Sequence, residues 1–221
     1  MTRVDLVVLD FDGTVCDSAD VKTEAFGLLY AEHGEDVANA VVSHHLANVG
    51  VTRTEKIRYA EEVLLGRPHS TERVDQLAAR FGTIVEEQVI AAPLLPGVAT
   101  FLSSYSGEIP IAVASATPTD ELRRIVAAKG LARFFAAVEG YPPHKGAILS
   151  RYVDRYGAAP QRTAMVGDQL SDLEAAEEAG TLFVGMRPNG AERVFADTVP
   201  VVTDLGALPA VVEDLTQNSE S

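Results

Sequence analysis

Two aspartates that are separated by one residue, Asp10 and Asp12, follow a short apolar run near the start of the chain. Like charges at this spacing repel each other, so folding gains little from the pair unless a cation lies between its oxygens. With a cation present, one carboxylate can attack phosphorus while the other transfers the proton of the leaving or attacking oxygen. Gly13 allows the backbone to turn sharply after the pair. Taken alone, the pair also fits an ordinary solvated turn.

A second acidic group, Asp168 and Asp172, also follows an apolar run. Asp168 is expected at the end of a strand and Asp172 in the first turn of a helix capped by Ser171, so both carboxylates can face one cavity. Because Mg²⁺ prefers oxygen ligands and keeps several waters, a few carboxylates suffice to bind it. For Asp172 alone, a favourable interaction with the helix dipole is the competing explanation.

Two residues between these acidic groups could bind a phosphoryl group. Ser115 ends an apolar run just before a helix for which Thr117 is the expected N-cap, and a hydroxyl beside free backbone N–H groups suits phosphate. Lys145 lies in a proline-containing loop that leads into a helix, where its ammonium group could neutralise Asp10 and the phosphoryl group. Each residue alone would more simply be a helix cap or a surface charge.

The elements that must position these residues are short apolar runs alternating with helical patterns. Runs typical of strands in a parallel sheet occur at Val4–Leu9, Ile109–Ala114, Ala136–Glu139, Thr163–Val166, Leu182–Val184 and Val199–Val202. The candidate side chains follow the carboxyl ends of these runs, the edge at which open α/β sheets bind ligands. The alternation predicts an α/β fold with a doubly wound parallel sheet.

Residues 18–92 interrupt the alternation with a pattern that is helical only. Helices are expected at Asp20–His33, Val37–Asn48 and Thr54–Leu65, and a fourth around Val74–Val85. We therefore expect an α/β catalytic core formed by residues 1–17 and 93–221, with an inserted helical domain formed by residues 18–92.

The composition argues against several classes of function. The chain of 221 residues has a formal net charge of −14 without a basic stripe, so nucleic acid and anionic membranes are not expected partners. Cys16 is the only cysteine, which excludes an internal disulfide. We expect Cys16 to be a small buried residue rather than a nucleophile. No apolar run approaches the length of a membrane span or a signal peptide's apolar segment. We expect a cytoplasmic monomer or homodimer that acts on a small molecule.

The motifs, taken in order, resemble those of the haloacid dehalogenase-like hydrolase superfamily. The matching pieces are Asp10-Phe11-Asp12-Gly13-Thr14, then Ser115, then Lys145, and finally Gly167-Asp168 with Asp172. The resemblance covers essentially the whole chain, and the helical insertion is similar to the family's small helical cap. Within the superfamily, the chain resembles the phosphatase branch with a small helical cap, whose members are of the phosphoglycolate phosphatase and β-phosphoglucomutase type.

This resemblance implies a role for each residue. Asp10 would be the nucleophile and Asp12 the general acid and base, with Ser115 and Lys145 completing the catalytic set. Phosphate would be bound by Gly13, Thr14, Ser115, Ala116 and Lys145. Mg²⁺ would be bound by Asp10, the backbone carbonyl of Asp12, and Asp168, with Asp172 nearby or supporting through water. The implied activity is Mg²⁺-dependent removal of phosphate from a sugar phosphate or a phosphoglycolate-like metabolite.

Asp12 also discriminates among the reactions of the superfamily. Dehalogenase-like and phosphonatase-like members lack a carboxylate at this position, so Asp12 disfavours both, although a cap lysine could form the Schiff base of a phosphonatase. A phosphomutase of the β-phosphoglucomutase type has a similar first motif and stays open as the alternative. A non-catalytic phosphate-binding or regulatory module, such as a receiver domain, is disfavoured because Asp12 would let water hydrolyse the stored aspartyl-phosphate.

Basic residues of the insertion could select the substrate. Lys22, Arg53 and Lys56 could contact an anionic or hydroxyl-rich substrate, and the competing interpretation is that they are ordinary solvated charges. His44 and His45 are not expected to bind a metal together, because adjacent residues on a helix point in different directions.

Overall fold

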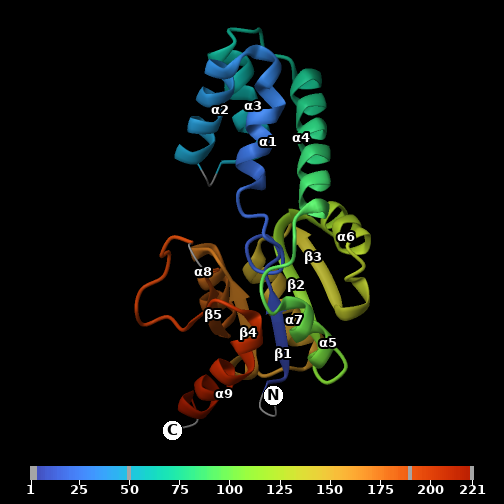
Figure 1. The fold of residues 1–221 in the computed structure, drawn as a ribbon, viewed down its shortest axis with the longest axis vertical. Helices are drawn as coiled ribbons and strands as arrows, with labels where there is room; N and C mark the ends of the chain where they lie inside the picture. Colours follow the sequence, from blue (N-terminus) through green and yellow to red (C-terminus); the bar gives the residue numbers. More distant parts are fainter. Residues whose placement is uncertain (1–3, 49–50, 189–190, 220–221) are drawn as a thin grey trace. The chain divides into compact units, whose positions relative to one another are not determined.

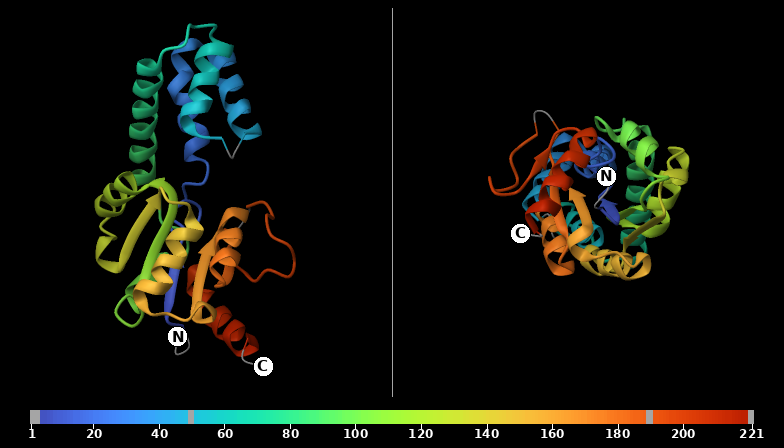
Figure 2. Two further views of the ribbon diagram at one scale, coloured as in Figure 1. Left: turned by 180° about the vertical axis from the view of Figure 1, so that it is seen from behind. Right: turned by 90° about the horizontal axis from the view of Figure 1, so that it is seen from below.

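The computed structural model describes residues 4–48, 51–188 and 191–219 (Figures 1 and 2). Contacts within the chain define two compact units. Unit 1 comprises Met1–Asp17 and Ala92–Ser221, and unit 2 comprises Ser18–Ala91. Among the described residues, no helix combines the length and the apolar character needed to cross a lipid bilayer.

Unit 1 is built on a parallel sheet whose described strands lie in the order β3-β2-β1-β4-β5-β6. The strands are β1 (Leu6–Leu9), β2 (Ile111–Pro118), β3 (Ala137–Tyr141), β4 (Thr163–Gly167), β5 (Leu182–Met186) and β6 (Val201–Val202). Every residue of β1 and β4 is buried, as expected for central strands covered on both faces. The order reverses between β1 and β4, so their carboxyl ends flank the crevice where doubly wound sheets bind ligands.

Helices cover both faces of this sheet. They are α5 (Val98–Tyr105), α6 (Thr119–Ala128), α7 (Lys145–Tyr156), α8 (Leu170–Ala179) and α9 (Leu208–Ser219), with short 3₁₀ turns at Ala132–Phe134, Pro160–Arg162 and Leu205–Ala207. Helices α7 and α8 lie side by side on the face opposite α5 (Figures 1 and 2). Ile148 and Tyr152 of α7 pack against Leu6, Val8 and Met165 of the sheet. The predicted doubly wound α/β fold is confirmed.

Unit 2 is entirely helical within its described residues. It contains α1 (Val21–Tyr30), a 3₁₀ turn (Ala31–His33), α2 (Glu35–Ala47), α3 (Arg53–Tyr59), a π-helix (Ala60–Leu64) and α4 (Thr71–Ala91). Phe26 of α1 and Phe81 of α4 are buried together, with ring centroids 4.4 Å apart. The unit therefore has a hydrophobic core of its own.

The structure corrects three details of the expected elements. Strand β2 continues through Pro118 because it pairs with β3 at Tyr141, so Thr117 is not an N-cap and α6 begins at Thr119. Helix α8 begins at Leu170 with Gln169 as its N-cap, which places Ser171 inside the helix.

The third correction concerns the expected helix Thr54–Leu65, which is an α-helix followed by a π-helix. Buried Glu61 lies in this π-helical segment and forms ion pairs with Arg67 and Arg73, which the apolar spacing of the sequence did not indicate.

Candidate active site

Asp10 lies at the carboxyl end of β1, in the centre of the sheet. Its backbone N–H donates to the carbonyl of Val166 on β4 at 2.9 Å, and only 6% of the residue is exposed. The chain then turns tightly, because the N–H groups of Val15 and Cys16 both donate to the carbonyl of Phe11. Cys16 is fully buried in this turn, as predicted, and burial raises the pKa of its thiol to about 12.

Gly13 is needed where this turn passes the end of β4. It has a positive φ of 76°, and a Cβ at this position would lie 2.4 Å from Oδ2 of Asp168. A side chain would therefore both strain the backbone and overlap that carboxylate. The absence of a side chain at Gly13 lets the β1 turn and Asp168 approach each other.

Lys145 is the first residue of α7 and connects two of the predicted acids. Its Nζ donates to Oδ1 of Asp10 at 2.8 Å and also to Oδ1 of Asp172. Burial alone would lower the pKa of Lys145, but the charges and hydrogen bonds of Asp10 and Asp172 outweigh it and raise that pKa. Lys145 is therefore a fixed ammonium group inside the site and not a solvated surface charge.

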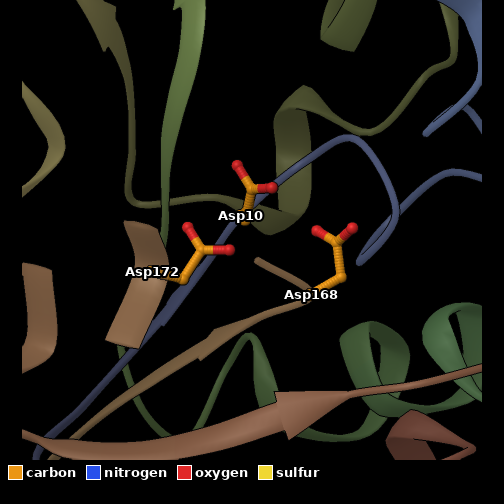
Figure 3. A group of neighbouring side chains, drawn as sticks. All are labelled: Asp10, Asp168 and Asp172. Carbon is orange, nitrogen blue, oxygen red and sulfur yellow. The ribbon is translucent and has the colours of Figure 1, made fainter. Parts of the chain in front are cut away.

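Asp168 follows β4 and brings a third carboxylate to the site. Oxygens of Asp10, Asp168 and Asp172 all lie within 4.8 Å of one another, and their side chains converge in Figure 3. Oδ2 of Asp168 accepts from Nε2 of Gln169 at 2.6 Å. Its Oδ1 is buried without a hydrogen-bond partner in the described chain. An orphaned carboxylate oxygen of this kind is a site where a cation would compensate the cost of burial.

The charge balance of the site also fits a cation. Lys145 forms ion pairs with Asp10 and Asp172, two of the three clustered carboxylates. The pKa of Asp10 is raised to about 8, chiefly because the carboxyl group is buried; Lys145 acts to lower this pKa, and the charges of Asp172 and Asp168 act to raise it. Burial likewise raises the pKa of Asp168. Because the donors are carboxylate oxygens, the cation that fits is a hard ion of the Mg²⁺ or Ca²⁺ type.

Asp172 differs from Asp168 because both of its oxygens already have partners. Oδ1 contacts Lys145, and Oδ2 accepts the backbone N–H of Gln169 at 3.0 Å. The residue is fully buried, and Gly167 makes its position possible because a Cβ there would lie 2.2 Å from Oδ2 of Asp172. These contacts suit a residue that orients Lys145 and supports the cation site from behind.

Ser115, Ala116 and Lys145 border a cavity of about 260 Å³ within unit 1. Lys145 connects this cavity to Asp10, although Asp10, Asp168 and Asp172 are not among the described residues that line it. Oγ of Ser115 accepts the backbone N–H of Thr117 at 3.1 Å, so its hydroxyl proton can be donated to a ligand. Thr14 is also fully buried, and its hydroxyl has no partner within the described chain.

Thr117 is a residue of the site that the sequence did not reveal. Its hydroxyl donates to Oδ2 of Asp12 at 3.3 Å, although the two residues are 105 positions apart. The Thr-Pro pair had indicated a helix cap, and only the pairing of β2 with β3 places Thr117 beside Asp12.

The three basic candidates of the insertion lie in unit 2. Lys22 is on α1 and Arg53 begins α3, where its guanidinium group lies 5.2 Å from the ring centroid of Phe81. Lys56 is 97% buried, with Nζ 2.9 Å from Nδ1 of His45, so the interpretation as a solvated charge is wrong for Lys56. Burial lowers the pKa of Lys56. Contact of the three residues with a substrate stays a prediction.

Comparisons with known proteins agree on one family. The family described as haloacid dehalogenase-like hydrolase matches residues 4–180. A phosphoglycolate phosphatase of Escherichia coli K12 is 28% identical over 205 residues, which cover 81% of this chain and 80% of the relative. A predicted phosphoglycolate phosphatase from Haemophilus somnus superposes with a TM-score of 0.71 at 20% identity, over 96% of this chain and 99% of that one. A putative β-phosphoglucomutase from Thermotoga maritima has the same TM-score, identity and coverage.

Proposed function

This chain belongs to the haloacid dehalogenase-like hydrolase family and is a phosphatase of that family, and we propose that it removes phosphate from a small metabolite through an aspartyl-phosphate on Asp10. The observation that carries the proposal is the position of Lys145, which joins Asp10 to Asp172 beside an Asp168 oxygen that has no hydrogen-bond partner among the described residues. A buried nucleophile, a fixed positive charge and an oxygen-rich cation site are the parts that phosphoryl transfer requires.

Asp10 is proposed as the nucleophile. Lys145 fixes its Oδ1, so Oδ2 can attack phosphorus, form the new O–P bond and displace the leaving oxygen. The ammonium group of Lys145 offsets the repulsion between Asp10 and the phosphoryl oxygens. Ser115, Ala116, Gly13 and Thr14 are proposed to bind the phosphoryl group through hydroxyl or backbone N–H groups.

Asp12 is proposed as the general acid and then the general base. It gives its proton to the leaving oxygen as the aspartyl-phosphate forms, and it later removes a proton from the water that attacks phosphorus. Inorganic phosphate leaves and Asp10 returns to its free form. The half-buried position of Asp12, two residues after the nucleophile, supports this role.

The proposed cofactor is Mg²⁺. Asp10, Asp168 and the backbone carbonyl of Asp12 would bind it, with Asp172 supporting the site through water and through Lys145. When bound, Mg²⁺ would supply positive charge that favours the ionised form of Asp10 and neutralises the phosphoryl oxygens.

We propose that unit 2 serves as the cap domain, with Lys22, Arg53 and Lys56 as substrate contacts. The proposed substrates are sugar phosphates and phosphoglycolate-like compounds, since relatives of the chain are named phosphoglycolate phosphatases. The cytoplasmic location and the monomeric or homodimeric state stay predictions, which cell fractionation and light scattering would test.

The test is release of inorganic phosphate from 4-nitrophenyl phosphate and a panel of phosphorylated metabolites, with and without Mg²⁺. We expect Mg²⁺-dependent release that Asp10→Asn abolishes. A phosphomutase would instead return an isomerised sugar phosphate without net phosphate release. Equal activity of the wild-type protein and the Asp10→Asn variant would remove Asp10 from the proposed role.

A further inference from the structure

We propose that Thr117 is a positioning residue that holds the carboxylate of Asp12 toward the reacting oxygen. The inference rests on the proposed role of Asp12 as general acid and base. It starts from the hydrogen bond between Oγ1 of Thr117 and Oδ2 of Asp12, which joins the end of β2 to the turn after β1. Thr117 is 97% buried, so little water can compete for its hydroxyl.

The backbone around Thr117 is fixed by close contact with β3. The register between β2 and β3 shifts between Ser115 and Pro118, which makes an irregularity at Thr117. Gly140 of β3 lies so close that a Cβ on it would be 1.9 Å from the carbonyl oxygen of Thr117. The hydroxyl of Thr119 donates to the carbonyl of Gly140 and accepts its N–H, both at 2.9 Å. These contacts place Thr117 independently of Asp12.

At this irregularity Thr117 forms hydrogen bonds with two residues of the site, Ser115 and Asp12. The N–H of Thr117 donates to Oγ of Ser115, while its side chain donates to Asp12. The distance of 3.3 Å to Asp12 is longer than usual for a hydroxyl donor, as is common for catalytic hydrogen bonds before the substrate binds. Thr117 thus couples the orientation of the proposed acid to that of the proposed phosphate-binding serine.

This role predicts a dependence on the leaving group that a merely structural role does not. An alkyl phosphate has a basic leaving oxygen and needs proton donation by Asp12, whereas 4-nitrophenolate leaves without it. The parameter kcat/KM reports the steps up to the aspartyl-phosphate, in which Asp12 acts as the acid. Misplacing Asp12 should therefore reduce kcat/KM for alkyl phosphates selectively.

The experiment compares Thr117→Val, which keeps the side-chain shape and removes the hydroxyl, with Thr117→Ser, which keeps the hydroxyl. For Thr117→Val we expect kcat/KM to fall about 10- to 100-fold with glycerol 3-phosphate or another accepted alkyl phosphate, and less than about 3-fold with 4-nitrophenyl phosphate. For Thr117→Ser we expect less than about a 3-fold change with either substrate. An equal loss with both substrates, or no loss with either, would overturn the proposal.

Asp12→Asn separates this proposal from the proposed function. If that variant loses alkyl phosphate hydrolysis selectively while Thr117→Val does not, only the role of Thr117 fails. If Asp12→Asn retains full kcat/KM with alkyl phosphates, the proposed acid role of Asp12 fails and the inference about Thr117 fails with it. Thermal unfolding of each variant shows whether a loss of activity reflects the site or the fold.

Discussion

Gly167→Ala tests how the carboxylate of Asp172 is held. Gly167 ends β4, and a Cβ built on it would lie 2.2 Å from Oδ2 and 2.4 Å from Cβ of Asp172. Real Cβ atoms essentially never approach other atoms closer than 3.0 Å. The second distance involves an atom next to the backbone of α8, so a simple side-chain rotation cannot remove the overlap. Asp172 must move by about 1 Å, and the start of α8 must move with it.

The expected cost follows from what Asp172 contacts. A displaced carboxylate cannot keep both the N–H of Gln169 and the ammonium group of Lys145. Because a displacement of about 1 Å in a catalytic site can cost roughly 100-fold in rate, we expect kcat to fall by about that factor. Overpacking of a buried position should also reduce the free energy of unfolding by about 1–3 kcal/mol.

The assay measures phosphate release and thermal unfolding, with Gly107→Ala as the matched control. Gly107 is exposed, and a Cβ on it would have no neighbour within 4 Å. The control should therefore leave both quantities nearly unchanged. In an Asp172→Gly background, which removes the overlapping atoms, Gly167→Ala should destabilise the protein less than it does alone. A Gly167→Ala variant as active and as stable as the control would refute this reasoning.

Three further predictions concern Asp168, Glu61 and Cys16. Asp168→Asn should raise the Mg²⁺ concentration for half-maximal activity by about 10-fold or more, and an unchanged Mg²⁺ titration would contradict the assigned cation site. Burial would raise the pKa of Glu61, but hydrogen bonds from Arg73 and Arg67 hold that pKa below its usual value. The stabilisation by Glu61 should thus be full above its unfolded-state pKa of about 4.3 and be lost as the pH falls through its lower folded-state pKa, so the unfolding free energies of wild type and Glu61→Gln should converge in acid. A difference that persists undiminished in acid would oppose this. Cys16 is buried with a pKa raised to about 12, so Ellman's reagent at pH 8 should react rapidly only after unfolding, and immediate reaction of the folded protein would contradict its burial.

The fold could be predicted because its signals are local. The apolar runs that become β1 and β4 are buried along their whole length, and the acids that follow them reach the same edge of the sheet. Strand ends and chain order therefore sufficed to bring Asp10 and Asp168 together. The position of Lys145 beside Asp10 was expected from the family resemblance, because a lysine in the loop between β3 and α7 would by itself more simply be a surface charge.

Other features depend on contacts between distant residues and could not be predicted. Thr117 looked like a helix cap until the pairing with Gly140 and Tyr141 extended β2 past it. Asp172 was expected near the cation or supporting it through water, but its contacts with Lys145 and with the backbone N–H of Gln169 could not be predicted. The burial of Lys56 against His45 likewise depends on how α2 and α3 pack.

The most direct test of the account is chemical identification of the residue that carries phosphate. The protein would be mixed with a phosphomonoester and Mg²⁺, quenched in acid during turnover, and reduced with borohydride, which converts an aspartyl-phosphate into homoserine. Mass spectrometry of the tryptic peptide between Arg3 and Lys22 would then locate the change. The account predicts homoserine at position 10 and unmodified Asp12. A turnover-dependent modification at another residue, with Asp10 unchanged, would contradict it.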